Sequence, residues 1–213
     1  MRIGILGSGE VGRTLGRAFI ACGHEVKLGS REAGNPKVKE WVGKTGAHAS
    51  GGTFEEVAKF GEIIVLATLW AGTENALRLA GAANLAGKVV IDATNPLDFT
   101  TTPPRLAVGC TDSAGEQVQR WLTTARVVKA FNMIGSAHMF RPEFPGGPPD
   151  MFICGNDQSA KQAVSRILNE FGWEVIDLGR IEASRHLECL AMLWITYGFR
   201  HKSWNHAFRL LRK

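Results

Sequence analysis

The chain has 213 residues, of which 45% are hydrophobic and 21% charged, and its formal net charge at pH 7 is +5. This length allows a sizeable hydrophobic core, and the composition is that of an ordinary globular protein rather than a disordered or fibrous one. Basic residues are neither interleaved with aromatic residues nor concentrated before the C-terminus, so we expect no nucleic-acid partner, and anionic small ligands account for the charge equally well.

The cysteines and the hydropathy pattern also exclude several classes of protein. Cys22, Cys110, Cys154 and Cys189 lie far apart, with no C-x-x-C pair and no histidine at metal-ligand spacing. We therefore predict reduced, mostly buried thiols and no metal site, in a cytoplasmic protein. The longest apolar run, 190–199, is shorter than the about eighteen residues of a membrane helix. Because the first predicted strand begins at residue 2, we expect no signal peptide.

The first thirty-one residues predict a dinucleotide-binding unit. Residues 2–6 are a short apolar run typical of a buried strand, and the sequence GSGEVG follows at 7–12. Apolar residues at helical spacing over 14–22 predict a helix that ends at Gly23, and 25–28 predict a second strand. With a strand before it and a helix after it, G-x-G-x-x-G is the fingerprint of a dinucleotide site.

Each glycine of this loop has its own predicted purpose. Gly7 permits the sharp turn, Gly9 lets the backbone approach a pyrophosphate, and Gly12 lets the helix pack on the sheet. The free N–H groups of the helix N-terminus favour phosphate charge.

The end of the second strand predicts which dinucleotide is used. An Asp or Glu there would favour NAD, but the chain has Ser30 and Arg31, which offer a hydroxyl and a planar cation to a 2′-phosphate. Glu32 lies one residue beyond the usual position, and Lys37 adds positive charge nearby. We predict NADP(H) rather than NAD(H).

The rest of the chain alternates strands and helices. A capping box of Thr53 and Glu56 opens one helix, and the continuous apolar run 63–67 is typical of a parallel strand covered on both faces. Further strands are predicted at 47–50, 88–92, 126–130, 151–154 and 174–178, and helices at 38–44, 54–60, 72–80, 112–122, 159–171 and from 184 onward.

This order predicts an α/β fold with a Rossmann-like, doubly wound, mostly parallel sheet and a small C-terminal helical closure. We expect an NADP-binding domain at 1–130 and a smaller C-terminal α/β part at 131–213 that packs on it and closes the active-site crevice. Four of the eight prolines lie between Pro142 and Pro149 and predict a structured connection or a lid.

Two further features concern the strand ends and the tail. Asp92 ends a strand and is expected to cap neighbouring N–H groups rather than act in catalysis. In the loop 93–97 that follows this strand, Pro96 fixes a turn and restricts Asn95, so we expect this loop to be rigid. The apolar stripe of the last helix predicts core packing or a homodimer contact, and His186, His201 and His206 have no identifiable partner.

Together these motifs resemble the NADP oxidoreductases that depend on coenzyme F420, and the NADPH-binding domain of the six-transmembrane metalloreductases. The resemblance covers nearly the whole chain and is carried by GSGEVG at 7–12, GSR at 29–31, IDATNPL at 91–97, KAFNMIG at 129–135 and ICGND at 153–157. The chain departs from the F420 reductases at Ser8, where Thr is common, and at Leu69, where Pro is common.

The resemblance implies a role for each matched position. Ser30 and Arg31 would hold the 2′-phosphate, and Trp194 or Tyr197 would complete the acceptor pocket. The residues implied to hold the pyrophosphate are Gly7, Ser8, Gly9, Glu10, Val11 and Gly12. The residues implied to line the nicotinamide are Thr68, Leu69, Trp70, Asn95 and Pro96, and those implied on the acceptor's side are Ala130, Asn132, Met133 and Ile134.

We therefore hypothesise hydride transfer between NADP(H) and a small-molecule acceptor, either the deazaflavin F420 or a flavin (FMN or FAD). Such a ring stores the electrons itself, so no catalytic side chain is required. One alternative is reduction of a small imine or keto acid, with Lys129, Asp92 or His138 as the acid. The other is a protein that senses NADP(H) without turning it over.

Overall fold

An eight-stranded sheet runs through the protein, and the computed structural model describes residues 1–213. Its strand order is β10-β9-β8-β5-β4-β1-β2-β3. All neighbouring strands are parallel except β8 and β9, so the predicted mostly parallel, doubly wound sheet is confirmed. The strands are β1 (Arg2–Leu6), β2 (Glu25–Ser30), β3 (Ala49–Thr53), β4 (Ile63–Leu66), β5 (Val89–Asp92), β8 (Arg126–Lys129), β9 (Asp150–Gly155) and β10 (Glu174–Asp177). A separate antiparallel ribbon pairs β6 (Leu97–Asp98) with β7 (Arg105–Leu106).

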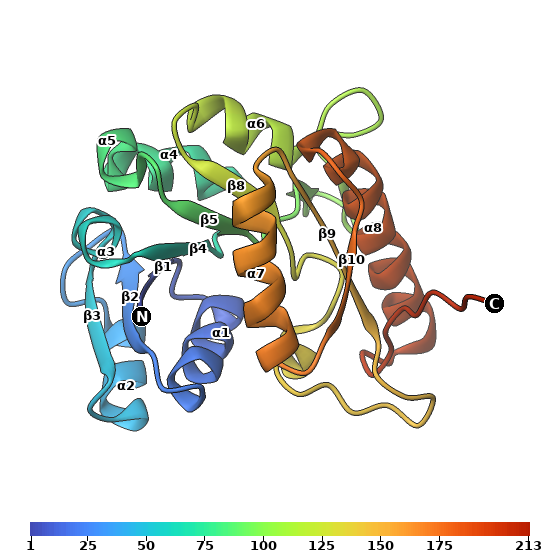
Figure 1. Ribbon diagram of the computed structural model, residues 1–213, viewed down its shortest axis with the longest axis horizontal. Helices are drawn as coiled ribbons and strands as arrows, with labels where there is room; N and C mark the ends of the chain where they lie inside the picture. Colours follow the sequence, from blue (N-terminus) through green and yellow to red (C-terminus); the bar gives the residue numbers. More distant parts are fainter.

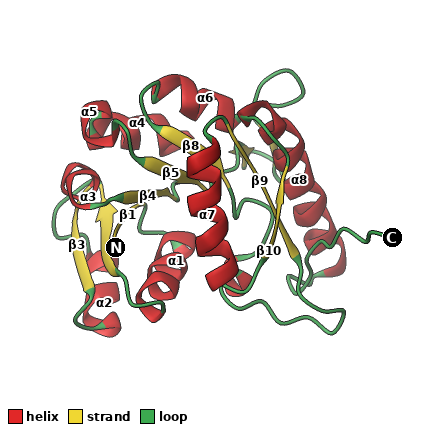
Figure 2. Ribbon diagram, viewed as in Figure 1, coloured by secondary structure: helices red, strands yellow, loops and turns green.

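Helices cover both faces of the sheet. They are α1 (Glu10–Ala21), α2 (Pro36–Thr45), α3 (Phe54–Phe60), α4 (Trp70–Ala80), α5 (Ala82–Leu85), α6 (Ala114–Trp121), α7 (Gln158–Glu170) and α8 (Ser184–His201). Figure 1 shows α4, α5 and α6 along the upper side and α1 and α2 along the lower side, with the strands between them. Figure 2 shows the same layers by secondary structure. The rings of Phe19 in α1 and Phe171 beyond α7 meet edge to face at 5.0 Å.

Local signals account for several helix ends. The predicted capping box is confirmed, since Glu56 N donates to Thr53 Oγ1 at 3.3 Å and Thr53 N donates to Glu56 Oε2 at 2.7 Å. Helix α1 begins at Glu10 rather than Thr14, because Gly9 is its N-cap and Arg13 N donates to Gly9 O. Strand β3 lies a few residues later than predicted, and α5 and the β6–β7 ribbon were not predicted.

The C-terminal part shares its core with the rest of the protein. One cluster of 46 buried apolar residues extends from Ile3 to Ala191, and β9 continues the sheet beside β8. The 142–149 segment is a structured connection, fastened where Arg209 Nη1 donates to Gly146 O and Asp150 N donates to Phe208 O. The predicted homodimer stays a prediction, although Leu193 and Tyr197 of α8 are exposed.

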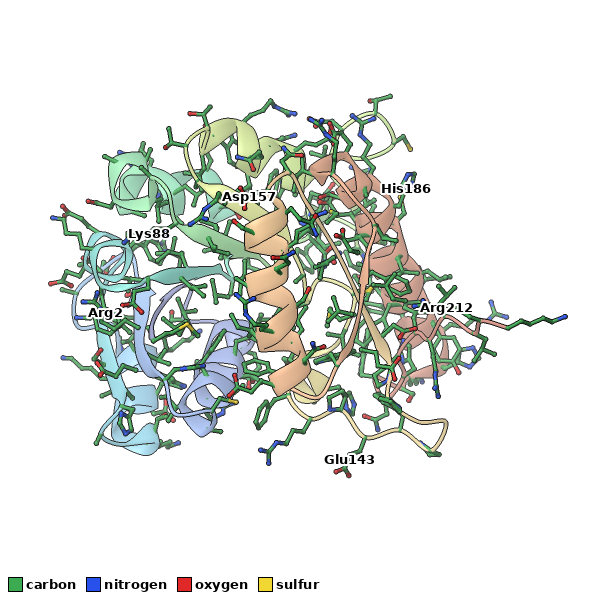
Figure 3. The ribbon with its side chains drawn as sticks, in the orientation of Figure 1. Arg2, Lys88, Glu143, Asp157, His186 and Arg212 are labelled. Atoms are coloured by element: carbon green, nitrogen blue, oxygen red, sulfur yellow. The ribbon has the colours of Figure 1, made fainter.

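Both charged and large apolar side chains are exposed on this part. Figure 3 shows Glu143 and Arg212 pointing away from the protein, while Asp157 lies at the upper end of α7. There Asp157 Oδ1 accepts from Ala160 N at 2.7 Å and caps the helix. None of the helices is both long enough and apolar enough to cross a membrane.

The prediction of mostly buried cysteines is wrong. Only Cys154 is buried, Cys22 is half-buried, and Cys110 and Cys189 are exposed. Spacing along the chain does not report exposure, which depends on the elements that pack over each thiol. Burial also raises the pKa of the Cys154 thiol to about 11.

This difference in exposure predicts selective alkylation. At pH 8, iodoacetamide should modify Cys110 and Cys189 in the native protein, while Cys154 should react only after denaturation, because its buried thiol stays protonated. Peptide mass spectrometry over a time course would measure this. Modification of Cys154 as fast as that of Cys110 would contradict the packing described.

Candidate functional site

A cleft of about 1100 Å³ opens at the carboxyl ends of the parallel strands. It lies where the strand order reverses between β1 and β4, which is the usual ligand position in doubly wound sheets. All of its lining residues fall between Gly7 and Phe99. They come from the glycine loop, the segment from the end of β2 to the start of α2, the start of α3, the turn after β4 with the first turns of α4, and the segment after β5.

The glycine loop is built by close backbone contacts. Gly7 has φ +131°, and a Cβ there would overlap Ala67 O at the end of β4. A Cβ on Gly12 would overlap Gly7 O, whereas a Cβ on Gly9 would meet nothing within 4 Å. The fold itself therefore requires glycine at Gly7 and Gly12, whereas Gly9 leaves open space at the N-terminus of α1.

The N-terminus of α1 faces this space without a capping side chain. Its first N–H groups are thus available to an anion, and the helix dipole favours negative charge there. The loop has the features that a diphosphate needs, namely free donors and no side chain at Gly9.

Glu10 is the one acidic side chain of the loop, and it is neutralised locally. Its carboxylate pairs with Arg13 at 2.5 Å and with Arg17 at 3.5 Å. The hydrogen bond from Arg13 holds the pKa of Glu10 below its usual range. These arginines offset a charge that would otherwise repel an anion in the cleft.

The segment after β2 forms a cationic end of the cleft. Ser30 is 5% exposed and its hydroxyl donates to Glu32 O at 2.7 Å, whereas Arg31 is exposed and has no ion pair. Lys37 lies in the first turn of α2, where its N donates to the capping side chain of Asn35. The cleft lining includes Ser30, Arg31 and Lys37 together with Asn35 and Pro36, which were not predicted.

The opposite end is apolar and uncharged. Leu69 and Phe99 are 73% and 62% exposed, and the Trp70 ring stacks on Trp121 at 5.6 Å. The four titratable side chains of the cleft, Glu10, Arg31, Glu32 and Lys37, all belong to the glycine loop and the segment after β2. No general acid lines the turns after β4 and β5.

Several predicted residues lie behind the cleft rather than on its wall. Gly12 and Pro96 support the lining turns, and Asn132 reaches the lining only through Asn95, to which its Nδ2 donates at 3.0 Å. The residues after β8 are buried, and Asn132 Nδ2 donates to Leu187 O of α8. Three residues that the resemblance placed on the acceptor's side are buried and do not line the cleft: Ala130, Met133 and Ile134.

The expected closure of the crevice by residues 131–213 stays a prediction; the residues that line the cleft all lie between Gly7 and Phe99. Trp194 is buried against the His206 ring at 4.6 Å, and Tyr197 is exposed on α8. His206, for which the sequence offered no partner, thus packs on Trp194.

The predicted capping by Asp92 is confirmed, since its Oδ1 accepts from Thr94 N at 2.9 Å. The sequence did not reveal that Asp92 Oδ2 also accepts from Lys129 Nζ at 3.0 Å. Both side chains are completely buried, and no group of His, Cys, Asp and Glu side chains is arranged to hold a metal ion.

Comparison with known sequences finds relatives whose descriptions name NADP. The family model described as NADP oxidoreductase coenzyme F420-dependent matches residues 2–96. An F420-dependent NADP reductase of Methanocaldococcus jannaschii is 30% identical, with 99% of this chain aligned to 98% of that protein. The rat metalloreductase STEAP3 is also 30% identical over 90% of this chain, which spans only 36% of the metalloreductase's length.

Solved structures extend the similarity. A candidate F420-dependent NADP reductase from Arthrobacter sp. FB24 superimposes with a TM-score of 0.92 at 39% identity, over 99% of both chains. An imine reductase from Bacillus cereus gives a TM-score of 0.67 at 16% identity, covering 94% of this chain and 62% of its own, and shares the fold alone.

The glycine contacts predict that two similar substitutions have unequal effects on the free energy of unfolding. Gly12→Ala should lower the free energy of unfolding by about 1–3 kcal/mol, because its Cβ overlaps the Gly7 carbonyl. Gly9→Ala should stay within about 1 kcal/mol of the wild type, because its Cβ enters open space. Urea denaturation followed by circular dichroism measures both. Equal destabilisation would contradict the described loop.

Proposed function

The chain belongs to the family of F420-dependent NADP oxidoreductases and is an NADP-dependent oxidoreductase, and from this premise we propose that it transfers a hydride between NADP(H) and a deazaflavin or flavin. The bound nicotinamide supplies or receives the hydride, and the acceptor ring stores the electrons. The protein then needs to bind both rings, orient them and exclude water.

The observation that carries this proposal is the division of the cleft into a charged end and an uncharged end. Every titratable side chain lies at the glycine loop or after β2, and none lies at the turns after β4 and β5. Transfer to a carbonyl or imine calls for a proton donor beside the nicotinamide, whereas a flavin-like ring does not require one from the protein.

Each end of the cleft then has a function. The N–H groups of α1 bind the pyrophosphate, and Ser30, Arg31 and Lys37 bind the 2′-phosphate, where the exposed and unpaired guanidinium of Arg31 is a suitable donor. Thr68, Leu69, Trp70 and Asn95 line the nicotinamide half. The exposed apolar side chains of Leu69 and Phe99 are the surfaces on which an aromatic acceptor would pack.

The alternatives have less support. For an imine or keto-acid reductase, Lys129 and Asp92 would be the acid, but both are completely buried and paired with each other. His138 does not line the cleft and pairs with Asn205. A protein that only senses NADP(H) would not need the exposed apolar wall at Leu69 and Phe99.

The choice of cofactor is tested at Arg31. Arg31→Met should raise the KM for NADPH by roughly 10- to 100-fold, because a charged hydrogen bond to the 2′-phosphate is lost, and should leave the KM for NADH unchanged. Arg166→Met, which removes an exposed arginine of α7, is the matched control. Equal effects on both cofactors would contradict the role of Arg31.

The acceptor is tested by following NADPH oxidation at the nicotinamide absorbance with F420, FMN, FAD and riboflavin in turn. We expect turnover with one of these rings, and Phe99→Ala should raise the KM for that acceptor by roughly tenfold through lost packing, with unchanged NADPH affinity. Tight NADPH binding without oxidation by any ring would refute the proposal. An equal loss of NADPH affinity in Phe99→Ala would place this side chain on the cofactor instead.

A further inference from the structure

A completely buried cluster of charges lies beneath the uncharged end of the cleft. Lys129 Nζ is 3.0 Å from Asp92 Oδ2 and 2.9 Å from Glu188 Oε1, and the three side chains are at most 1% exposed. Burial alone would lower the pKa of Lys129, but the two carboxylates more than offset it and raise the pKa above its ordinary value. Lys129 is therefore an ammonium group that joins β5, β8 and α8.

The cluster is connected to neighbours at both of its ends. Glu188 accepts from Ala114 N at 3.0 Å and from Gly115 N at 3.1 Å, at the N-terminus of α6. Asp92 accepts from both the N–H and the hydroxyl of Thr94, at 2.9 and 2.7 Å. Thr94 lines the cleft, so an unbroken series of contacts leads from α6 and α8 to the cleft wall.

A second connection reaches the next residue of the same wall. Asn95 Nδ2 donates to Asn132 O at 2.6 Å, and Asn132 Nδ2 donates back to Asn95 Oδ1 and also to Leu187 O of α8. Leu187 and Glu188 thus hold Asn95 and Thr94 by separate routes. In Figure 3 this end of α8, where His186 is labelled, lies beside α6.

Such a cluster has a high desolvation cost, and buried ion pairs often add little stability over apolar residues of the same size. What it does supply is orientation. Without Glu188, Lys129 loses one of its two partners and becomes free to shift. Asp92 is bonded to Lys129 and accepts both hydrogen bonds from Thr94, so a shift of Lys129 would act on Thr94 through this carboxylate.

We propose that Lys129 and Glu188 are positioning residues for the Thr94–Asn95 wall, through which α8 controls the nicotinamide half of the site without touching the ligand. This inference rests on the proposed function, which puts the nicotinamide at that wall. The adenosine half lies against the glycine loop and the segment after β2, which the cluster does not contact.

The test compares two ligands that differ by the nicotinamide half. Isothermal titration calorimetry would measure Kd for NADP⁺ and for adenosine 2′,5′-bisphosphate, which lacks that half, in the wild type and in Glu188→Gln. We expect NADP⁺ to bind roughly three- to tenfold more weakly in the variant, while Kd for the bisphosphate stays within about twofold. Thr94→Val removes the hydroxyl contact to Asp92 from the other end, and should give the same pattern if Glu188→Gln does not fold.

The control is Lys161→Met, which breaks the ion pair between the buried Lys161 of α7 and the exposed Asp177 of β10. It should change the melting temperature without changing either Kd. Equal weakening of both ligands in Glu188→Gln, or no change in either, would overturn the positioning role. A wild-type protein that binds neither ligand would overturn the proposed function and this inference with it.

Discussion

The architecture depends on a backbone contact where β1 turns into α1. Gly7 lies against Ala67 O at the end of β4, and Gly12 of the helix lies against Gly7 O, so neither position has room for a Cβ. These contacts fix the direction of α1 and bring its uncapped N-terminus to the point where the strand order reverses. Every other part of the cleft is arranged around that helix end.

The distribution of charge within the cleft follows from the strand ends. The end of β2 and the start of α2 contribute Arg31 and Lys37, while the turns after β4 and β5 contribute hydroxyls, amides and apolar side chains. The cleft therefore has a charged end and an end without titratable side chains. The cationic end suits the phosphate groups of a dinucleotide.

The C-terminal part continues the sheet and the hydrophobic core of the rest of the protein. Its strands extend the sheet through β9, and α8 packs on α6 and on the residues that follow β8. The buried bonds of Glu188 to α6 and of Leu187 O to Asn132 connect this helix to the cleft wall.

The sequence by itself determined the features that depend on local geometry. These are the strand, glycine loop and helix at 2–21, the capping box of α3, and the capping of Thr94 by Asp92, because each is set by residues a few positions apart. Only the tertiary structure decided that Lys129 pairs with Glu188, that Ala130, Met133 and Ile134 are buried away from the cleft wall, and that two cysteines are exposed. Burial and ion pairing depend on which distant element packs over a residue, and no local pattern encodes that neighbour.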